Sequence, residues 1–166
     1  MKETLRRMQK KRAAGDGGFT LVELLVVVVI IGVLVAIAVP MYLNYRKGAA
    51  NKSAESDVRA AVSAIEQFYT ENNNAYPEST TADVQTKLLF GTTASGTTAT
   101  GGTPQTATLS PGNSMQYKRA STKDSYRICA VNTDGGVYYV YDSSAGGSVR
   151  KAADGIKTMD TCLATG

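Results

Sequence analysis

Residues that commonly carry enzymatic chemistry are sparse in this chain of 166 amino acids. It contains no histidine, which excludes a Ser-His-Asp triad, a Cys-His pair and any histidine-liganded metal site. The alternative hypothesis is a membrane-tethered hydrolase, which could use one of two carboxylate pairs, Asp134 with Asp142 or Glu66 with Glu71. The local patterns favour simpler roles, because Asp134 opens a glycine-rich turn and Glu66 falls on the polar face of a predicted helix. We therefore expect no enzyme and no cofactor.

Residue types that hold metal ions also lack suitable spacing. Cys129 and Cys162 stand far apart, without the CxxC pairs typical of zinc sites. Asp142, Asp154 and Asp160 are scattered and do not form a calcium-loop pattern. We expect no metal site. The two cysteines are either a buried pair of thiols or a disulfide, and a disulfide requires that this part of the chain lie outside the cytoplasm.

One carboxylate stands in an unusual place, near the start of an apolar segment that begins at Phe19. A charge inside an apolar membrane helix costs about 2.5–3.5 kcal/mol on insertion scales. Glu23 therefore either lies near the membrane surface or has a charged partner. If the peptide bond after Gly18 is cut, Phe19 gains an ammonium that can pair with Glu23 of a neighbouring subunit. Such buried pairs are best known for fixing register, so this pair would form only in an assembly.

The apolar segment from Phe19 to Val39 has 21 residues, of which Glu23 alone is charged. That length matches the ~20 residues that cross a hydrocarbon core of ~30 Å. Six basic and two acidic residues precede it within 1–18, and the rest of the chain carries 12 of each sign. The basic flank predicts a cytoplasmic N-terminus and an exported body, which favours the disulfide. The neutral body does not support a nucleic-acid partner, although it leaves one open.

The apolar segment is followed by a second helical pattern. No small-x-small cleavage signal follows the segment, so we expect it to be retained. Pro40 ends it, and in a membrane helix a proline more often kinks the helix than breaks it. Asn72-Asn73-Asn74 and Pro77 predict that the helix ends near residue 71. The apolar stripe of the second half consists of Val58, Ala61, Val62, Ile65, Phe68 and Tyr69.

The C-terminal half of the chain predicts β-structure. Residues 91–110 are rich in Thr and Gly and offer almost nothing to bury, which predicts an exposed loop that tolerates change. Period-two patterns then predict strands, with Asp134-Gly135-Gly136 as a hairpin turn and a coil from residue 151 to Cys162. The expected strands cover 114–119, 126–131, 137–141 and 148–150. Tyr138, Tyr139 and Tyr141 are expected to pack in the sheet rather than to stack on bases or sugars. A helix followed by an antiparallel meander is an α+β arrangement.

The residues from Gly18 to Glu23, with the apolar run Leu24–Val39 and then Pro40, resemble the start of type IV pilins and pseudopilins. The resemblance is specific over 15–50 and weaker over 51–77. Beyond residue 77 it rests on the layout of helix, loop, antiparallel sheet and C-terminal disulfide loop. It implies the pilin fold, in which a long helix with a transmembrane half and an amphipathic half packs on a sheet of three to four strands.

The resemblance also implies how the precursor is processed. In that family a membrane prepilin peptidase cuts after the leader glycine and methylates the new N-terminus. Here this means cleavage between Gly18 and Phe19, N-methylation of Phe19 and an assembly role for Glu23. Phe19 as the first mature residue favours the a-type subclass. The implied parts are a cytoplasmic leader (1–18), an anchor and assembly helix (19–50) and an exported globular domain (51–166).

By the same resemblance, the chain is a structural subunit that starts as a single-pass membrane precursor. It then polymerises with other pilin subunits into an extracellular filament, with the help of inner-membrane assembly machinery. Such filaments support adhesion, twitching motility or DNA uptake. The alternative is the major pseudopilin of a type II secretion system, which resembles calcium-loop proteins and usually lacks a C-terminal disulfide. The predicted Cys129–Cys162 bond favours the surface pilus, as a major subunit or as an adhesive or DNA-uptake minor one.

Overall fold

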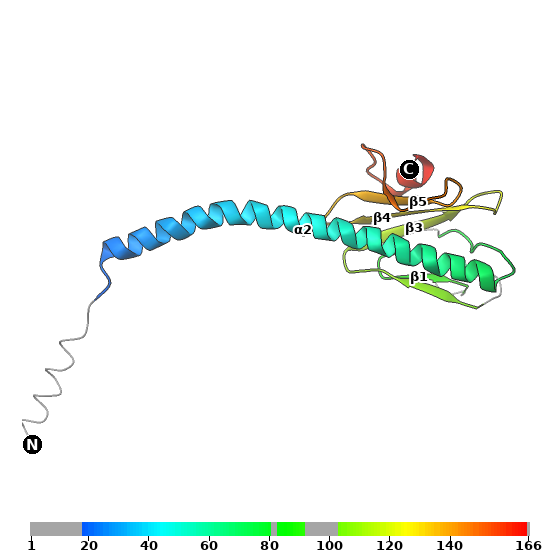
Figure 1. The fold of residues 1–166 in the computed structure, drawn as a ribbon, viewed down its shortest axis with the longest axis horizontal. Helices are drawn as coiled ribbons and strands as arrows, with labels where there is room; N and C mark the ends of the chain where they lie inside the picture. The colour runs from blue at the N-terminus through cyan, green and yellow to red at the C-terminus, as the bar shows by residue number, and fades with distance from the viewer. Residues whose placement is uncertain (1–17, 81–82, 92–102, 166) are drawn as a thin grey trace, which may run out of the picture. The chain divides into compact units, whose positions relative to one another are not determined.

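The structure is a computed structural model that describes residues 18–80, 83–91 and 103–165 (Figure 1). The contacts divide the chain into two units, 1–42 and 43–166, and helix α2 contributes to both of them. In chain order the elements are α2 (Leu21–Glu71), β1 (Lys87–Phe90), β2 (Gln105–Thr108), β3 (Asn113–Arg119), β4 (Tyr126–Asn132), β5 (Tyr138–Asp142), β6 (Arg150–Lys151) and α3 (Met159–Thr165).

The described part of the first unit is mainly the apolar start of α2. Its large apolar side chains are all exposed, with fractions from 49% at Val39 to 84% at Phe19. The helix continues through Pro40 without interruption. A helix that is apolar on every side needs lipid or other protein around it, and among the described residues the large apolar side chains of this part of α2 are exposed.

In the second unit, α2 buries one stripe against β-structure. The buried residues are Ala54, Asp57, Val58, Ala61, Ala64, Ile65 and Phe68. This largely confirms the predicted stripe, although Val62 and Tyr69 are only half-buried. The prediction for Glu66 is wrong, because this residue is half-buried and its carboxylate accepts a 2.7 Å hydrogen bond from the Tyr126 hydroxyl. The Tyr126 side chain is 2% exposed, and a buried tyrosine hydroxyl usually has a partner.

The larger sheet is an antiparallel meander in the order β3-β4-β5-β6. Strand β4 lies in its interior and pairs Ile128 with Tyr117 on one side and with Tyr141 on the other. Alternate residues of β4 serve two different cores, since Ile128 packs toward α2 and Cys129 belongs to the other cluster. The three long predicted strands are confirmed to within two residues. The short one is shifted, since β6 is Arg150–Lys151.

A second hydrophobic cluster covers the face of this sheet opposite α2, so the sheet lies between α2 and α3 (Figure 1). It contains Met159, Cys162 and Leu163 from α3, where a coil was expected. The structure joins Cys129 of β4 to Cys162 of α3 by a disulfide, and both residues are fully buried. The helix forms because Thr158 caps it, accepting a 3.2 Å hydrogen bond from the Thr161 N–H.

The Thr/Gly-rich tract at 91–110 is only in part the exposed loop that its composition predicts. Residues 92–102 lie outside the described residues. Beyond them, β2 pairs with β1 in a separate two-stranded sheet. Ala107 and Leu109 are 3% and 6% exposed within the main core. The prediction failed because alternation of threonine with small apolar residues is enough to bury one face of a short strand.

A chain of polar contacts fastens α2 to the sheet. The Asp57 carboxylate, on a residue only 7% exposed, accepts hydrogen bonds from the Ser110 N–H and the Asn113 side chain, both at 2.6 Å. Asn113 in turn accepts a 2.6 Å bond from Asn132, which caps the β4–β5 turn. The network is buried and its carboxylate is fully engaged, which favours one position of the helix on the sheet.

The β4–β5 turn also contacts helix α2. Val137 N–H donates to the Asn51 side chain at 3.2 Å, and Arg46 pairs with Asp134 at 2.9 Å. Gly135 approaches the helix so closely that an added Cβ would lie 3.0 Å from the Asn51 nitrogen and 2.1 Å from its side-chain oxygen. A glycine is therefore required at this contact, which a hairpin-turn signal alone did not reveal.

Candidate functional site

Helix α2 starts with reciprocal hydrogen bonds between Thr20 and Glu23. The Thr20 hydroxyl accepts from the Glu23 N–H at 3.2 Å. The Glu23 carboxylate accepts from the Thr20 N–H at 2.9 Å and from its hydroxyl at 2.8 Å. This arrangement is a capping box, in which two residues satisfy each other's backbone donors. In the single chain, the Glu23 carboxylate is therefore held by the backbone N–H and the hydroxyl of Thr20.

Thr20 was not singled out from the sequence. The signal was present, since a Thr-x-x-Glu pattern immediately before an apolar run marks a helix start. The Thr20 carbonyl accepts the first helical hydrogen bond from the Leu24 N–H at 3.2 Å. The cap thus fixes the helix start two residues after Phe19 and leaves Phe19 outside the helix.

Gly18 and Phe19 lie directly before this cap, and both are exposed. A Cβ added to Gly18 would meet no atom within 4 Å. Among the described residues, nothing therefore imposes a steric need for glycine at this position. A requirement for glycine would have to come from another molecule that binds the Gly18–Phe19 bond, such as the subsite of a protease.

The apolar part of α2 extends from this exposed start. Among the described residues, α2 is the one helix long and apolar enough to cross a membrane, judged by length and composition. A signal sequence near an N-terminus meets the same description. Within the described residues, the site thus combines an exposed Gly18–Phe19 bond, a capped carboxylate and an exposed apolar helical surface.

The carboxylates considered as catalytic pairs are occupied elsewhere in the fold. Asp134 pairs with Arg46, and Glu71 accepts hydrogen bonds from Gln67 at 3.0 Å and Gln105 at 2.9 Å. Within the described ranges, no group of three or more His, Cys, Asp or Glu residues is placed to hold a metal ion.

Asp142 is also committed to structure. Its carboxylate pairs with Arg127 and accepts hydrogen bonds from the backbone N–H and hydroxyl of Ser144, at 3.0 and 2.6 Å. Burial alone would raise the pKa of Asp142, but these hydrogen bonds and the guanidinium charge lower the pKa to about 2. The contacts therefore keep Asp142 ionised into acid, down to about pH 2.

The tyrosines of β5 also have structural contacts. Tyr139 and Tyr141 pack partly buried against the main core, and the Tyr138 hydroxyl donates to the Lys157 carbonyl at 2.8 Å. The Tyr141 ring lies 5.7 Å from that of Tyr126. This is the packing role expected for the three β5 tyrosines.

Comparison with known proteins agrees with this site. The family profile described as "Prokaryotic N-terminal methylation motif" matches residues 14–39. The type II secretion system core protein G of Pseudomonas aeruginosa is 30% identical over 130 residues, which cover 77% of this chain and 89% of that protein.

Two other relatives match over shorter stretches. Core protein G of Aeromonas hydrophila is 40% identical over 70 residues, 42% of this chain and 46% of that protein. A fimbrial protein of Pseudomonas aeruginosa is 40% identical over 73 residues, 44% of this chain and 47% of that protein. The chain thus spans about half the length of these two relatives. No solved structure matches the chain significantly.

Proposed function

Because the chain belongs to the type IV pilin and pseudopilin family, we propose that it is the precursor of a subunit of a surface filament. The observation that carries this proposal is the start of α2. A helix with exposed apolar side chains from Leu21 to Tyr45 follows directly on an exposed Gly18–Phe19 bond. Such a surface is stable only in lipid or against other subunits.

Processing would occur at the Gly18–Phe19 bond. A prepilin peptidase removes residues 1–18 and the new amine of Phe19 is methylated. The open space around Gly18 supports this step, because no described residue lies within 4 Å of a Cβ built at this position. The leader also carries the positive excess that keeps it cytoplasmic before the cut.

Assembly would then depend on Glu23. In the single chain its carboxylate is held by Thr20, which lowers the cost of keeping a charge in an apolar helix. In the filament, the Phe19 ammonium of a neighbour would bind the same carboxylate. Because a charged donor is stronger than a neutral one, the intersubunit contact would be favoured once the subunits are in register.

Before assembly, residues 19–50 would anchor the precursor in the cell membrane with the exported domain, 51–166, outside. The bend expected at Pro40 would lie near the outer end of the anchor. Peptidase, assembly machinery and other pilin subunits would be its partners in turn. The role of the finished protein would be structural.

The filament is either a surface pilus or a secretion pseudopilus, and different observations favour each. A disulfide near the C-terminus favours the pilus, which would serve adhesion, motility or DNA uptake. The alternative, the major pseudopilin of a type II secretion system, is favoured by the relative that aligns over 89% of its length. Deletion of the gene separates them: loss of surface filaments indicates a pilus, and loss of protein export indicates a pseudopilus.

The test of processing is an intact-mass measurement on the chain expressed with a prepilin peptidase. We expect a product that begins at Phe19 and carries one added methyl group. Gly18→Val should leave the precursor uncut, since a branched side chain would crowd the protease subsite, whereas Gly17→Val serves as the matched control and should still be cut. A product that begins at Met1, or one cut after Pro40, would refute the proposal.

A further inference from the structure

Among dipeptides that contain aspartate, Asp-Gly is the one at which a protein backbone rearranges most readily at neutral pH. The backbone nitrogen of the second residue can attack the side-chain carboxyl group of the aspartate, and a glycine has no Cβ to shield that nitrogen. The chain contains Asp-Gly at 16–17, 134–135 and 154–155. Residues 16–17 lie outside the described residues. The structure distinguishes the other two dipeptides by the contacts of their reacting atoms.

The fold restrains Asp134 and Gly135. The Asp134 carboxylate pairs with Arg46 at 2.9 Å, although an exposed ion pair of this kind is weak. The Gly135 N–H donates to the side-chain oxygen of Asn132 at 3.4 Å. Gly135 also packs against Asn51 without room for a Cβ, which restricts rotation of this peptide group. The packing of Gly135 therefore disfavours approach of its nitrogen to the Asp134 carboxyl carbon.

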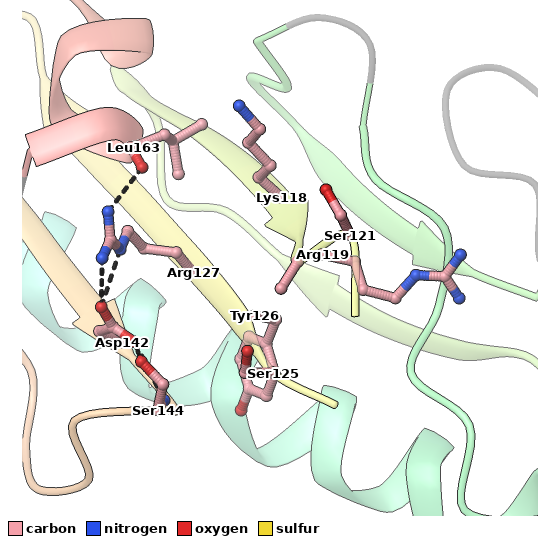
Figure 2. Close-up of a pocket in the computed structure, with 10 residues that line it drawn as sticks. Lys118, Arg119, Ser121, Ser125, Tyr126, Arg127, Asp142, Ser144 and Leu163 are labelled. Atoms are coloured by element: carbon pink, nitrogen blue, oxygen red, sulfur yellow. Dashed lines mark hydrogen bonds and ion pairs between the residues drawn. The ribbon is translucent and has the colours of Figure 1, made fainter. Parts of the chain in front are cut away.

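An aspartate followed by a small serine is also restrained. Asp142 precedes Ser143, and its carboxylate accepts hydrogen bonds from Arg127 and Ser144 (Figure 2). The Ser143 N–H, which contains the attacking nitrogen of this dipeptide, donates to the Tyr126 carbonyl at 3.0 Å. The fold thus holds both reacting groups of Asp142.

Asp154 and Gly155 are much less restrained. The Asp154 side chain is 94% exposed, and its pair with Lys151 at 3.1 Å is a weak surface ion pair. The Gly155 N–H has no hydrogen-bond partner among the described residues. Gly155 is exposed, and a Cβ built on it would meet no atom within 4 Å. Apart from the pair with Lys151, no contact in the described part of the chain keeps the two reacting atoms apart.

The backbone around this dipeptide is also free to change its dihedral angles. Residues 152–158 connect β6 to α3 without helix or strand. The Ala152 N–H donates to the Tyr138 carbonyl at 2.9 Å, and the Lys157 carbonyl accepts from the Tyr138 hydroxyl at 2.8 Å. Between these two anchors, no hydrogen bond from any described residue holds the backbone of 153–156. Segments with so few contacts rearrange at little cost in free energy.

We propose that Asp154 is the site at which the folded protein forms isoaspartate. The Gly155 backbone nitrogen attacks Cγ of Asp154, and a carboxyl oxygen leaves as water with the amide proton and one proton from solvent. A water molecule then opens the cyclic imide at the main-chain carbonyl of Asp154, whose bond to the nitrogen breaks. The chain now continues through Cγ. One water is lost and one is regained, and no electrons are transferred.

The product has a main chain that is longer by one methylene group. This insertion lies between the two anchors on Tyr138 and next to Ile156, which packs against the second hydrophobic cluster. Helix α3 stays attached, because Cys162 is bonded to Cys129. The modification should therefore loosen the connection between β6 and α3 without releasing α3. The site is independent of the Gly18–Phe19 bond, of Glu23 and of the apolar part of α2.

Ageing of the full chain in detergent, at neutral pH and below its melting temperature, tests the proposal. Electron-transfer fragmentation of tryptic peptides distinguishes isoaspartate from aspartate, and the peptide 152–157 contains Asp154 as its one aspartate. In the folded chain, isoaspartate should accumulate at least tenfold faster at Asp154 than at Asp134. In urea the two rates should approach each other, because the fold no longer restrains Gly135. Equal rates in the folded chain would overturn the proposal, as would an unchanged Asp154 after the unfolded chain has converted.

Variants at the two dipeptides sharpen this test. Asp154→Glu keeps the charge but would have to close a larger ring, which forms far more slowly. The label that an isoaspartyl methyltransferase transfers to the aged chain should therefore fall several-fold, whereas Asp134→Glu, the matched control, should leave it unaltered. The melting temperature of fresh Asp154→Glu should equal that of the parent chain, since the side chain is exposed. If the aged Asp154→Glu chain accepts as much label as the parent chain, the isoaspartate lies elsewhere and the assignment is wrong.

Asp154→Asn tests the attacking nitrogen directly. A side-chain amide is a better electrophile than a carboxylate, so this variant should form the same imide faster than the parent chain, with release of ammonia. If it converts no faster than the parent chain, the Gly155 nitrogen does not reach the side chain of residue 154 in the fold, which would contradict the proposal.

Discussion

Helix α2 has two parts that differ in what stabilises them. Between Leu21 and Tyr42 every large apolar side chain is exposed, whereas Val58, Ile65 and Phe68 are at most 2% exposed and pack on the sheets. Both parts belong to one continuous α-helix. The second is stabilised by its own chain, and the first must be stabilised by contacts from outside, which is how a single helix can serve both a folded domain and an assembly.

The same contrast holds for the carboxylates on the helix. Glu23 is held by Thr20, a residue three positions away, through exposed hydrogen bonds. Asp57 is buried and is held by residues more than fifty positions away in sequence, such as Ser110 and Asn113. A locally held carboxylate can exchange partners without unfolding anything, whereas Asp57 cannot.

The largest expected effect comes from Glu23→Val. We expect filament yield to fall at least tenfold, because the Phe19 ammonium of the neighbouring subunit would have no carboxylate in a dry bundle. Membrane insertion should be unchanged or improved, since an apolar residue replaces a charge. Electron microscopy of sheared surface filaments measures the first quantity, and immunoblots of the membrane fraction measure the second.

Glu71→Gln is the matched control, since it neutralises an exposed carboxylate at the opposite end of the same helix. It should preserve filaments. Normal filament yield from Glu23→Val would contradict the ion pair, and loss of its membrane pool would show that Glu23 serves insertion instead.

The next largest effect tests the folded part alone. Replacing Cys129 and Cys162 together by alanine should lower the free energy of unfolding by about 4 kcal/mol, from the entropy of the loop that the disulfide closes. Denaturant unfolding of the full chain in detergent, monitored by tyrosine fluorescence, measures the change. Membrane insertion should not respond, and a change below about 1 kcal/mol would mean that the second hydrophobic cluster holds α3 without the bond.

Asp57→Ala should destabilise the folded part by about 3 kcal/mol, because it leaves the Ser110 N–H without its acceptor and leaves the Asn113 amide with only the Ser53 hydroxyl to donate to. Asp57→Asn should cost less, since an amide oxygen can still accept one of these bonds. The same unfolding measurement compares them. If Asp57→Ala costs no more than Asp57→Asn, the network does not depend on the acceptor, and the contrast with Glu23 fails.

The smallest effect is a dependence on pH. The fold lowers the pKa of Asp142 from its ordinary value of 3.8 to about 2. The ionised carboxylate therefore stabilises the fold above pH 3.8. This contribution is lost as the pH falls through about 2. Between pH 4 and pH 2, Asp142→Asn should therefore lose up to about 2 kcal/mol less stability than the parent chain loses.

Asp134→Asn provides the comparison for that profile. The Asp134 side chain is 57% exposed in its pair with Arg46, and exposed ion pairs contribute about 0–1 kcal/mol. Its acid unfolding curve should follow the parent chain. A curve for Asp142→Asn that also follows the parent chain would show that the Arg127 contact does not persist in solution.

Patterns with strong periodicity were predictable from the sequence. The apolar run of α2, its later stripe at Val58, Ala61, Ile65 and Phe68, and the strands around the Asp134-Gly135-Gly136 turn all follow from spacing alone. The residues predicted for processing and assembly, Gly18, Phe19 and Glu23, also come from local sequence, and their roles await the experiments above.

Features that depend on distant partners were missed. Asp57 lies on the same helix as the exposed Glu23 and Glu71, and its contacts with Ser110 and Asn113 distinguish it from them. Glu66 was assigned to solvent for the same reason. Strand β2 and helix α3 are short, with four and seven residues, so their patterns were too brief to outweigh the composition around them.

The disulfide also has a mechanical consequence. The residues between Cys129 and Cys162 would span about 110 Å if pulled straight at ~3.4 Å per residue, yet the Cα atoms of the two cysteines are 6.2 Å apart. If the subunit bears tension along a filament, the disulfide prevents this segment from being extended even when the strands separate. Each subunit would then stretch about 100 Å less than an unbridged one, so the fibre would resist extension until a reductant opened the loop.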